Sequence, residues 1–183
     1  MNCPGFAIDS GNESGRIRSD QFFDVQIDPV YDHPVETADG YWLVTHNGQA
    51  FNVSQEGSQI HVSDAWSLLT EEDAEEKWRP GGGQLKTAHQ SLGLGYILMH
   101  QGKEYTHHES GSEIWVFDLA AQRRIARIEL EVPASDIMVT QEAEPLLLVV
   151  DDESGLHVYN AITMKRERTM EDSGPRAALL VDF

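Results

Sequence analysis

The sequence is poor in cysteine, in basic residues and in long apolar runs, and each shortage excludes a class of protein. Its 183 residues include one cysteine, Cys3, which cannot form an internal disulfide or a cysteine-rich metal site. No apolar stretch approaches the ~20 residues of a membrane-spanning helix. The formal net charge of −18 disfavours nucleic acid, whose binding depends on basic residues that neutralise phosphates. We therefore expect neither a membrane nor a nucleic acid as a partner.

The sequence also lacks the short motifs of independent catalysis. It has no GxSxG nucleophile elbow, no HExxH zinc motif, no phosphate loop and no GxGxxG between a strand and a helix. A glycine run, 81–83, follows Pro80 but lacks the downstream Lys and Ser or Thr of a phosphate loop, so we interpret it as a turn. An enzyme that uses only residues of this chain is disfavoured.

Two groups of polar residues suggest metal binding, and neither has suitable spacing. His107 and His108 are adjacent, with His100 nearby, but neighbours on an extended chain point to opposite sides. The acidic run 151–153 precedes Ser154 and Gly155, which is typical of a solvated hairpin turn rather than a calcium cage. We expect structural or solvated roles for both groups and no metal site.

A repeat at a spacing of 42 residues gives the fold class. Residues 114–129 (IWVFDLAAQRRIARIE) match residues 156–171 (LHVYNAITMKRERTME) in pattern, and Asp118 aligns with Asn160. Each copy is an alternating strand, a polar turn and a second strand, which is typical of the outer hairpin of a propeller blade. The sequence predicts an all-β protein with propeller blades.

Apolar segments supply the remaining strands of about three to four blades. Segments 94–99, 137–140 and 146–150 precede the two hairpins, and 41–45, 49–54 and 59–63 predict a further blade. The terminal segment 177–183 is predicted to be an isolated strand. Because closed propellers need roughly four to eight blades, we interpret residues 1–183 as a single partial propeller domain from a longer chain. Cys3 is then either a free thiol or half of a disulfide to the missing part.

An insertion between blades is the most distinctive segment. Residues 70–76 predict a short acidic helix with Thr70 as its N-cap and Asp73 three residues on. The sequence Trp78-Arg79-Pro80-Gly81 follows it. Insertions of this kind tend to lie on a propeller rim, where partners bind. The alternative is a buried turn that locks one blade to the next.

These segments resemble the heavy subunit of the quinoprotein amine dehydrogenases, of the methylamine and aralkylamine types. The resemblance covers nearly the whole chain and corresponds to the C-terminal half of that seven-bladed propeller. The motifs do not distinguish the methylamine type from the aralkylamine type, so they do not identify the amine substrate. The segments that carry the resemblance are Phe22-Phe23-Asp24, Ala65-Trp66-Ser67-Leu68-Leu69, Trp78-Arg79-Pro80-Gly81-Gly82, Lys103-Glu104, His107, Glu113-Ile114-Trp115-Val116 and Ala143-Glu144-Pro145-Leu146-Leu147.

The resemblance implies one subunit of a periplasmic oxidoreductase that converts a primary amine to an aldehyde and ammonia. The tryptophan tryptophylquinone cofactor belongs to the light subunit, so this chain is expected to carry no catalytic, cofactor or metal residue and to be inactive alone. A blue copper protein or another carrier accepts the electrons. Trp78, Arg79, Pro80 and Gly81 are expected to form a rim loop against the light subunit. Localisation rests on the family alone, since MNCPGFAIDSG does not read as a signal peptide.

A second function remains open, because many propellers only bind other proteins. In that alternative the chain is a non-catalytic propeller fragment that acts as an interaction scaffold. The four tryptophans are expected to be core or interface anchors in either case.

Overall fold

The computed structural model describes residues 34–45, 47–81, 85–102 and 110–171, and strands predominate in this part of the chain. The described residues contain one helix, α1 (Glu71–Glu75), so the all-β prediction is confirmed. Cys3, His107, His108 and the strand expected at 177–183 lie outside the described residues. No helix in the described ranges is long and apolar enough to span a bilayer.

The first blade is an antiparallel meander in which each strand pairs with the next. A short fifth strand pairs with the free end of the third, so the blade edge extends toward the helix. The strands match the blade predicted from segments 41–45, 49–54 and 59–63. They are β1 (Val35–Thr37), β2 (Gly40–Val44), β3 (Gln49–Glu56), β4 (Gln59–Val62) and β5 (Trp66–Ser67).

The middle blade has an inner strand in two pieces. The pieces β6 (Trp78–Pro80) and β7 (Lys86–His89) both pair antiparallel with β8 (Leu94–Gln101). β6 lies opposite residues 99–101 and β7 opposite residues 94–97, so two pieces share one strand position beside β8. The next strand, β9 (Gly111–Asp118), pairs with the other edge of β8.

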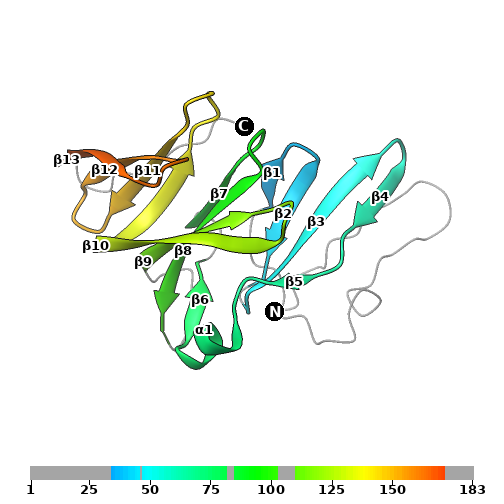
Figure 1. The fold of residues 1–183 in the computed structure, drawn as a ribbon, viewed down its shortest axis with the longest axis horizontal. Helices are drawn as coiled ribbons and strands as arrows, with labels where there is room; N and C mark the ends of the chain where they lie inside the picture. The colour runs from blue at the N-terminus through cyan, green and yellow to red at the C-terminus, as the bar shows by residue number, and fades with distance from the viewer. Residues whose placement is uncertain (1–33, 46, 82–84, 103–109, 172–183) are drawn as a thin grey trace, which may run out of the picture.

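One long strand belongs to two blades. The first part of β10 (Arg123–Val139) pairs with β9, and its residues 134–139 pair with β11 (Leu146–Asp151). The last blade continues with β12 (Leu156–Asn160) and β13 (Arg166–Met170). Three four-stranded meanders therefore follow one another, from blue to orange in Figure 1. They confirm a partial propeller.

The 42-residue repeat is reproduced in the two hairpin turns. In both, a short side chain accepts a hydrogen bond from the backbone three residues on: Asp118 Oδ1 from Ala121 N at 2.9 Å, and Asn160 Oδ1 from Thr163 N at 2.8 Å. The next residue adopts a left-handed conformation in each, with φ of 52° at Gln122 and 60° at Met164. The sequence match thus reflects a shared turn geometry.

The middle blade is buried on both faces, which explains the continuous apolar run in β8. Tyr96 and Leu98 belong to the core shared with the last blade. Ile97 and Met99 belong to the core shared with the first blade, together with Trp42. Successive residues of a strand point to opposite faces, so a blade covered on both sides requires apolar residues at every position.

Close packing between the first and middle blades requires glycine at position 95. A Cβ added to Gly95 would lie 2.6 Å from Cζ3 of Trp42 and 2.9 Å from Cδ2 of Leu119. Trp42 is fully buried. Leu119 is nearly buried as well.

We therefore predict that Gly95→Ala lowers the free energy of unfolding by about 1–3 kcal/mol, because overpacking forces side chains off their rotamers. Chemical denaturation measures this change. In a Trp42→Phe background, which removes the clashing ring atoms, the same substitution should cost less. Equal costs in the two backgrounds would show that the Trp42 contact is not the cause.

Candidate functional site

The residues predicted to form a rim loop lie in a strand. Trp78, Arg79 and Pro80 form β6, and the backbone N–H of Gly81 donates to the carbonyl of Leu98 at 2.8 Å. The expectation of a loop is wrong, because these residues complete the inner strand position beside β8. Trp78, Pro80 and Gly81 are buried and Arg79 is partly exposed.

Helix α1 orients a buried carboxylate beside this strand. Thr70 is the N-cap, as predicted, and its hydroxyl accepts from the backbone N–H of Asp73. The Asp73 carboxylate accepts in return from the Thr70 backbone N–H at 2.8 Å, which completes a capping box. Asp73 is only 3% exposed. The Asp73 carboxylate is therefore held in place by the first turn of its own helix.

Two tryptophans pack together next to the carboxylate. The Trp78 and Trp115 ring centroids are 5.3 Å apart at an interplanar angle of 48°. The Trp115 indole N–H donates to Glu113 Oε2 at 2.6 Å, and that of Trp78 donates to Glu76 Oε2 at 3.0 Å. Both indoles thus satisfy their polar atoms locally, as buried tryptophans usually do.

Two arginines from β10 cover the tryptophans and join the carboxylates. The Arg124 guanidinium lies 4.0 Å from the Trp115 ring centroid and donates to Asp73 Oδ2 at 2.9 Å. Arg127 lies 4.9 Å from both ring centroids and binds both oxygens of Glu113, at 2.7 and 2.8 Å. We call Asp73, Trp78, Glu113, Trp115, Arg124 and Arg127 the Trp–Arg network.

The network keeps its carboxylates ionised. Burial acts to raise the pKa of Glu113, but hydrogen bonds from Arg127 and Trp115 and the two arginine charges outweigh it and lower the pKa. Burial of Asp73 is likewise outweighed by hydrogen bonds from Thr70 and Arg124, so its pKa is lowered too. The hydrogen bond to Glu113 raises the pKa of Arg127. Such a network binds two elements tightly and leaves no group poised for proton transfer.

The other sequence candidates have structural partners. Asp151 accepts from the backbone N–H of Glu153 and Gly155, at 2.8 and 2.7 Å, as expected for a turn, but it is buried rather than solvated. Its Oδ2 lies 2.7 Å from His157 Nε2. His100 lies buried in β8. No group of three His, Cys, Asp or Glu residues that could hold a metal occurs within the described ranges.

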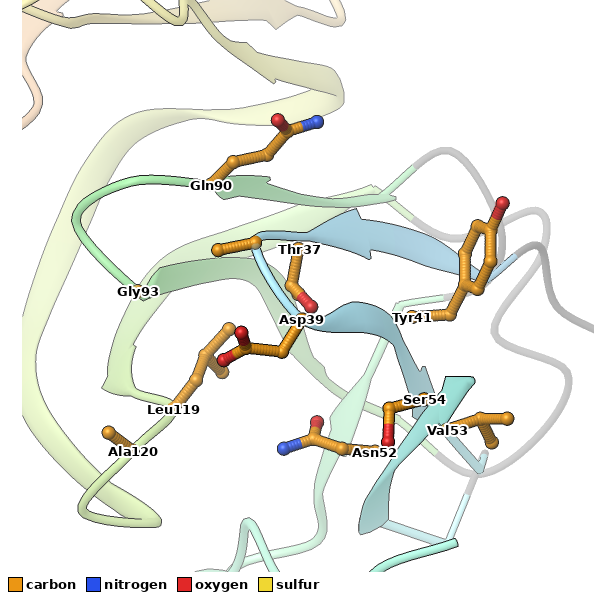
Figure 2. Close-up of a pocket in the computed structure, with 11 residues that line it drawn as sticks. Thr37, Asp39, Tyr41, Asn52, Val53, Ser54, Gln90, Gly93, Leu119 and Ala120 are labelled. Atoms are coloured by element: carbon orange, nitrogen blue, oxygen red, sulfur yellow. The ribbon is translucent and has the colours of Figure 1, made fainter. Parts of the chain in front are cut away.

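A cleft that the sequence did not indicate lies between the first and middle blades (Figure 2). It has a volume of about 280 Å³. The first blade contributes polar side chains, and the opposite wall comes from the turns after β7 and β9. Residues that line it include Thr37, Asp39, Asn52, Ser54, Gln90 and Leu119. The contributions come from separate segments, so only the fold brings them together.

The Trp–Arg network was likewise not predicted from the sequence, although one of its contacts could have been. Arg127 is the cross-strand partner of Trp115 on the neighbouring strand, and the predicted hairpin already placed them near each other. Asp73 was noted only as a capping residue. Its contact with Arg124, 51 positions along the chain, depends on tertiary packing.

The geometry of three four-stranded meanders defines part of a β-propeller, and comparison with known proteins gives the family. The profile described as "Methylamine dehydrogenase heavy chain (MADH)" matches residues 5–182. The methylamine dehydrogenase heavy chain of Methylobacillus flagellatus is 30% identical over 141 residues, which cover 75% of this chain and 35% of that protein. The protein of the same name from Paracoccus versutus is 27% identical over 180 residues, covering 95% and 42%.

The chain belongs to the methylamine dehydrogenase heavy chain family. The resemblance inferred from its motifs is thus confirmed. The chain spans less than half the length of these relatives. Among solved structures, apo AztD from Citrobacter koseri aligns over 78% of this chain and 47% of its own, with 9% identity and a TM-score of 0.42, which is too low to carry an inference.

We predict that Glu113→Gln lowers the free energy of unfolding at neutral pH by about 2 kcal/mol, since it removes charged hydrogen bonds while Arg127 stays partly solvated. The pKa of Glu113 is lowered in the folded state. The contribution of its ionised carboxylate to the free energy of unfolding is therefore fully present above the pKa of the unfolded chain. It is lost as the pH falls through the folded pKa.

The difference between Glu113→Gln and the parent chain, measured by denaturant unfolding, should therefore shrink as the pH falls below about 4. Glu129→Gln is the matched control, because Glu129 is the exposed cross-strand neighbour of Glu113. A stability difference that stays constant down to about pH 3 would contradict an ionised Glu113 as the cause.

Proposed function

We propose that this chain is part of the heavy subunit of an amine dehydrogenase, which oxidises a primary amine to an aldehyde and ammonia in the periplasm. The observation that carries the proposal is the family match over residues 5–182. The chain's residues correspond to a C-terminal portion of a longer heavy chain in this proposal. Electrons pass to a blue copper protein or another carrier.

The cofactor in this proposal is tryptophan tryptophylquinone on the light subunit, and it supplies the two-electron oxidation when bound. The tryptophans of this chain suit a different task. Trp42, Trp78 and Trp115 are buried, as predicted for core anchors. The indole N–H groups of Trp78 and Trp115 donate to carboxylates of the same chain. These residues support a scaffold that contributes no quinone precursor.

The scaffold role consists of holding a rigid rim against the light subunit, so that the reaction is shielded from water. β6 is suited to this role because Trp115 and Arg127 of the Trp–Arg network contact the Trp78 side chain and hold it in place. Arg79 is the partly exposed member of the segment and forms no ion pair with a described residue. Arginine beside an aromatic residue is a common interface anchor. We therefore assign the direct contact to Arg79 and a positioning role to Trp78.

We predict that Arg79→Ala weakens binding of the light subunit about tenfold, an effect typical of an interface anchor, while the melting temperature stays unchanged. Arg123→Ala is the matched control, since Arg123 is an exposed arginine at the start of β10. Trp78→Ala should instead destabilise the chain by about 3–5 kcal/mol, because it removes a buried ring. Equal binding by the Arg79 and Arg123 variants would refute the contact.

Purification from the native source tests the assembly itself. We expect a longer heavy chain and a small subunit with a visible quinone absorption to co-purify, as measured by intact mass and spectroscopy. A lone 20.5 kDa species without a chromophore would favour the alternative, a non-catalytic propeller fragment that acts as a scaffold.

A further inference from the structure

Three polar side chains of the last blade form a continuous hydrogen-bonded chain that the function proposed above does not use. Asp151 Oδ2 lies 2.7 Å from His157 Nε2, and His157 Nδ1 lies 3.1 Å from Thr169 Oγ1. Asp151 ends β11, His157 lies in β12 and Thr169 lies in β13. The chain therefore crosses three neighbouring strands, from a buried carboxylate to an exposed hydroxyl.

The Asp151 carboxylate is fixed and ionised. Its Oδ1 accepts from the backbone N–H groups of Glu153 and Gly155, which leaves Oδ2 for the imidazole. Burial acts to raise the pKa of Asp151, but hydrogen bonds from Gly155, His157 and Glu153 outweigh it and lower the pKa. An ionised carboxylate only accepts hydrogen bonds, so Nε2 of the neutral His157 ring carries the hydrogen. Nδ1 is then the acceptor for the Thr169 hydroxyl.

Strand pairing keeps the imidazole and the hydroxyl together. The Asn160 N–H donates to the carbonyl of Lys165, so Asn160 and every second residue before it in β12 direct their N–H groups toward β13. His157 occupies one of the intervening positions and lies opposite Thr169. The two residues are thus a non-hydrogen-bonded pair, the kind in which side chains lie closest and Cα atoms are typically about 4.5 Å apart.

Thr169 is accessible from the outside of the blade. β13 is the outermost strand of the last blade, and no described strand pairs with its outer edge (Figure 1). The same alternation that turns the backbone of its neighbours toward β12 turns the Thr169 N–H outward. This N–H can donate to a substrate oxygen that gains negative charge beside the hydroxyl.

The charges around His157 favour transfer of the hydroxyl proton to the ring. An imidazolium formed in this way lies beside the ionised Asp151. Glu131 of β10 is a second carboxylate nearby, because Arg166 and, to a smaller extent, His157 lower its pKa. Arg166 itself is bound to both oxygens of Glu131, at 2.8 and 3.2 Å. A base that is oriented by a carboxylate on one nitrogen and bound to a hydroxyl on the other is the usual means of activating a hydroxyl nucleophile.

We propose that Thr169 is a nucleophile that takes up the acyl group of an activated ester, with His157 as its general base and Asp151 as the residue that positions this base. The Thr169 oxygen bonds to the acyl carbon, and the bond from that carbon to the leaving oxygen breaks. The hydroxyl proton passes to His157 Nδ1 and then to the departing oxygen, so nothing is oxidised or reduced. The product is an ester on Thr169. The site is separate from β6 and does not depend on the function proposed above.

Reaction with 4-nitrophenyl acetate tests the site on the chain, in the assembly in which it purifies. We expect a burst of nitrophenolate and an acetyl group on Thr169, located by peptide mass mapping. Hydroxylamine should remove this group, because it cleaves an ester but leaves the amide of an acetylated lysine such as Lys165. Acetylation confined to lysines or to the amino terminus would overturn the proposal.

Variants separate a nucleophile from a structural hydroxyl. Thr169→Ala should abolish the burst and the hydroxylamine-sensitive acetylation, whereas Thr169→Ser keeps a hydroxyl and should retain both. Thr163→Ala is the matched control, since Thr163 is an exposed threonine in the β12–β13 turn, and it should react as the parent chain does. A loss as large in this control as in Thr169→Ala would overturn the proposal.

His157→Gln tests the base. Glutamine keeps a hydrogen-bond donor and acceptor at this position but cannot take up the proton, so acetylation of Thr169 should slow about a hundredfold or more. Cooperative unfolding of the variant, measured with denaturant, establishes that the blade is still folded. Equal acetylation rates in His157→Gln and the parent chain would show that the hydroxyl reacts without a base and would overturn the proposal.

Discussion

The burial of both faces of β8 and β9 is the constraint on which the rest of the described structure depends. Ile114 and Val116 face the last blade, whereas Trp115 and Phe117 face the first. Each outer blade therefore has one face fixed by the middle blade. A buried hydroxyl also links the middle and last blades, because Tyr96 donates to the carbonyl of Ala161 in the last blade at 3.0 Å. Burial raises the pKa of Tyr96 to about 12, so it remains a donor at physiological pH.

The Trp–Arg network shows how charged groups are accommodated next to such a core. Burying the Asp73 and Glu113 carboxylates is costly unless each keeps several hydrogen bonds. Glu113 meets this requirement through Arg127 and Trp115. Stacking of the two guanidinium groups on the rings adds a cation–π attraction. The network therefore secures the position of helix α1 and β6 more than it adds to net stability.

Much of the fold could be predicted from the sequence because its signals are local. The alternation of residues 114–118 and the Asp118 and Asn160 turns are set by neighbours within a few positions, so both hairpins are where the repeat places them. Thr70 is an N-cap for the same reason. The strand at Trp78–Pro80 was predicted as a loop because its pairing partner, residues 99–101, becomes evident only from the sheet. The cleft depends on four segments that are far apart in the sequence, and none of them indicates it alone.

The repeat also shows what the insertion changes. The cross-strand pair Trp115 and Arg127 corresponds, 42 positions on, to His157 and Thr169. In the last blade this pair forms a hydrogen bond of 3.1 Å between His157 Nδ1 and Thr169 Oγ1. In the middle blade Arg127 instead lies over the Trp115 ring and pairs with Glu113 of β9. Helix α1 and β6 add Asp73, which is 3.9 Å from Arg127, and the Trp78 ring to this contact. Helix α1 and the Trp–Arg network therefore make this hairpin a support for β6.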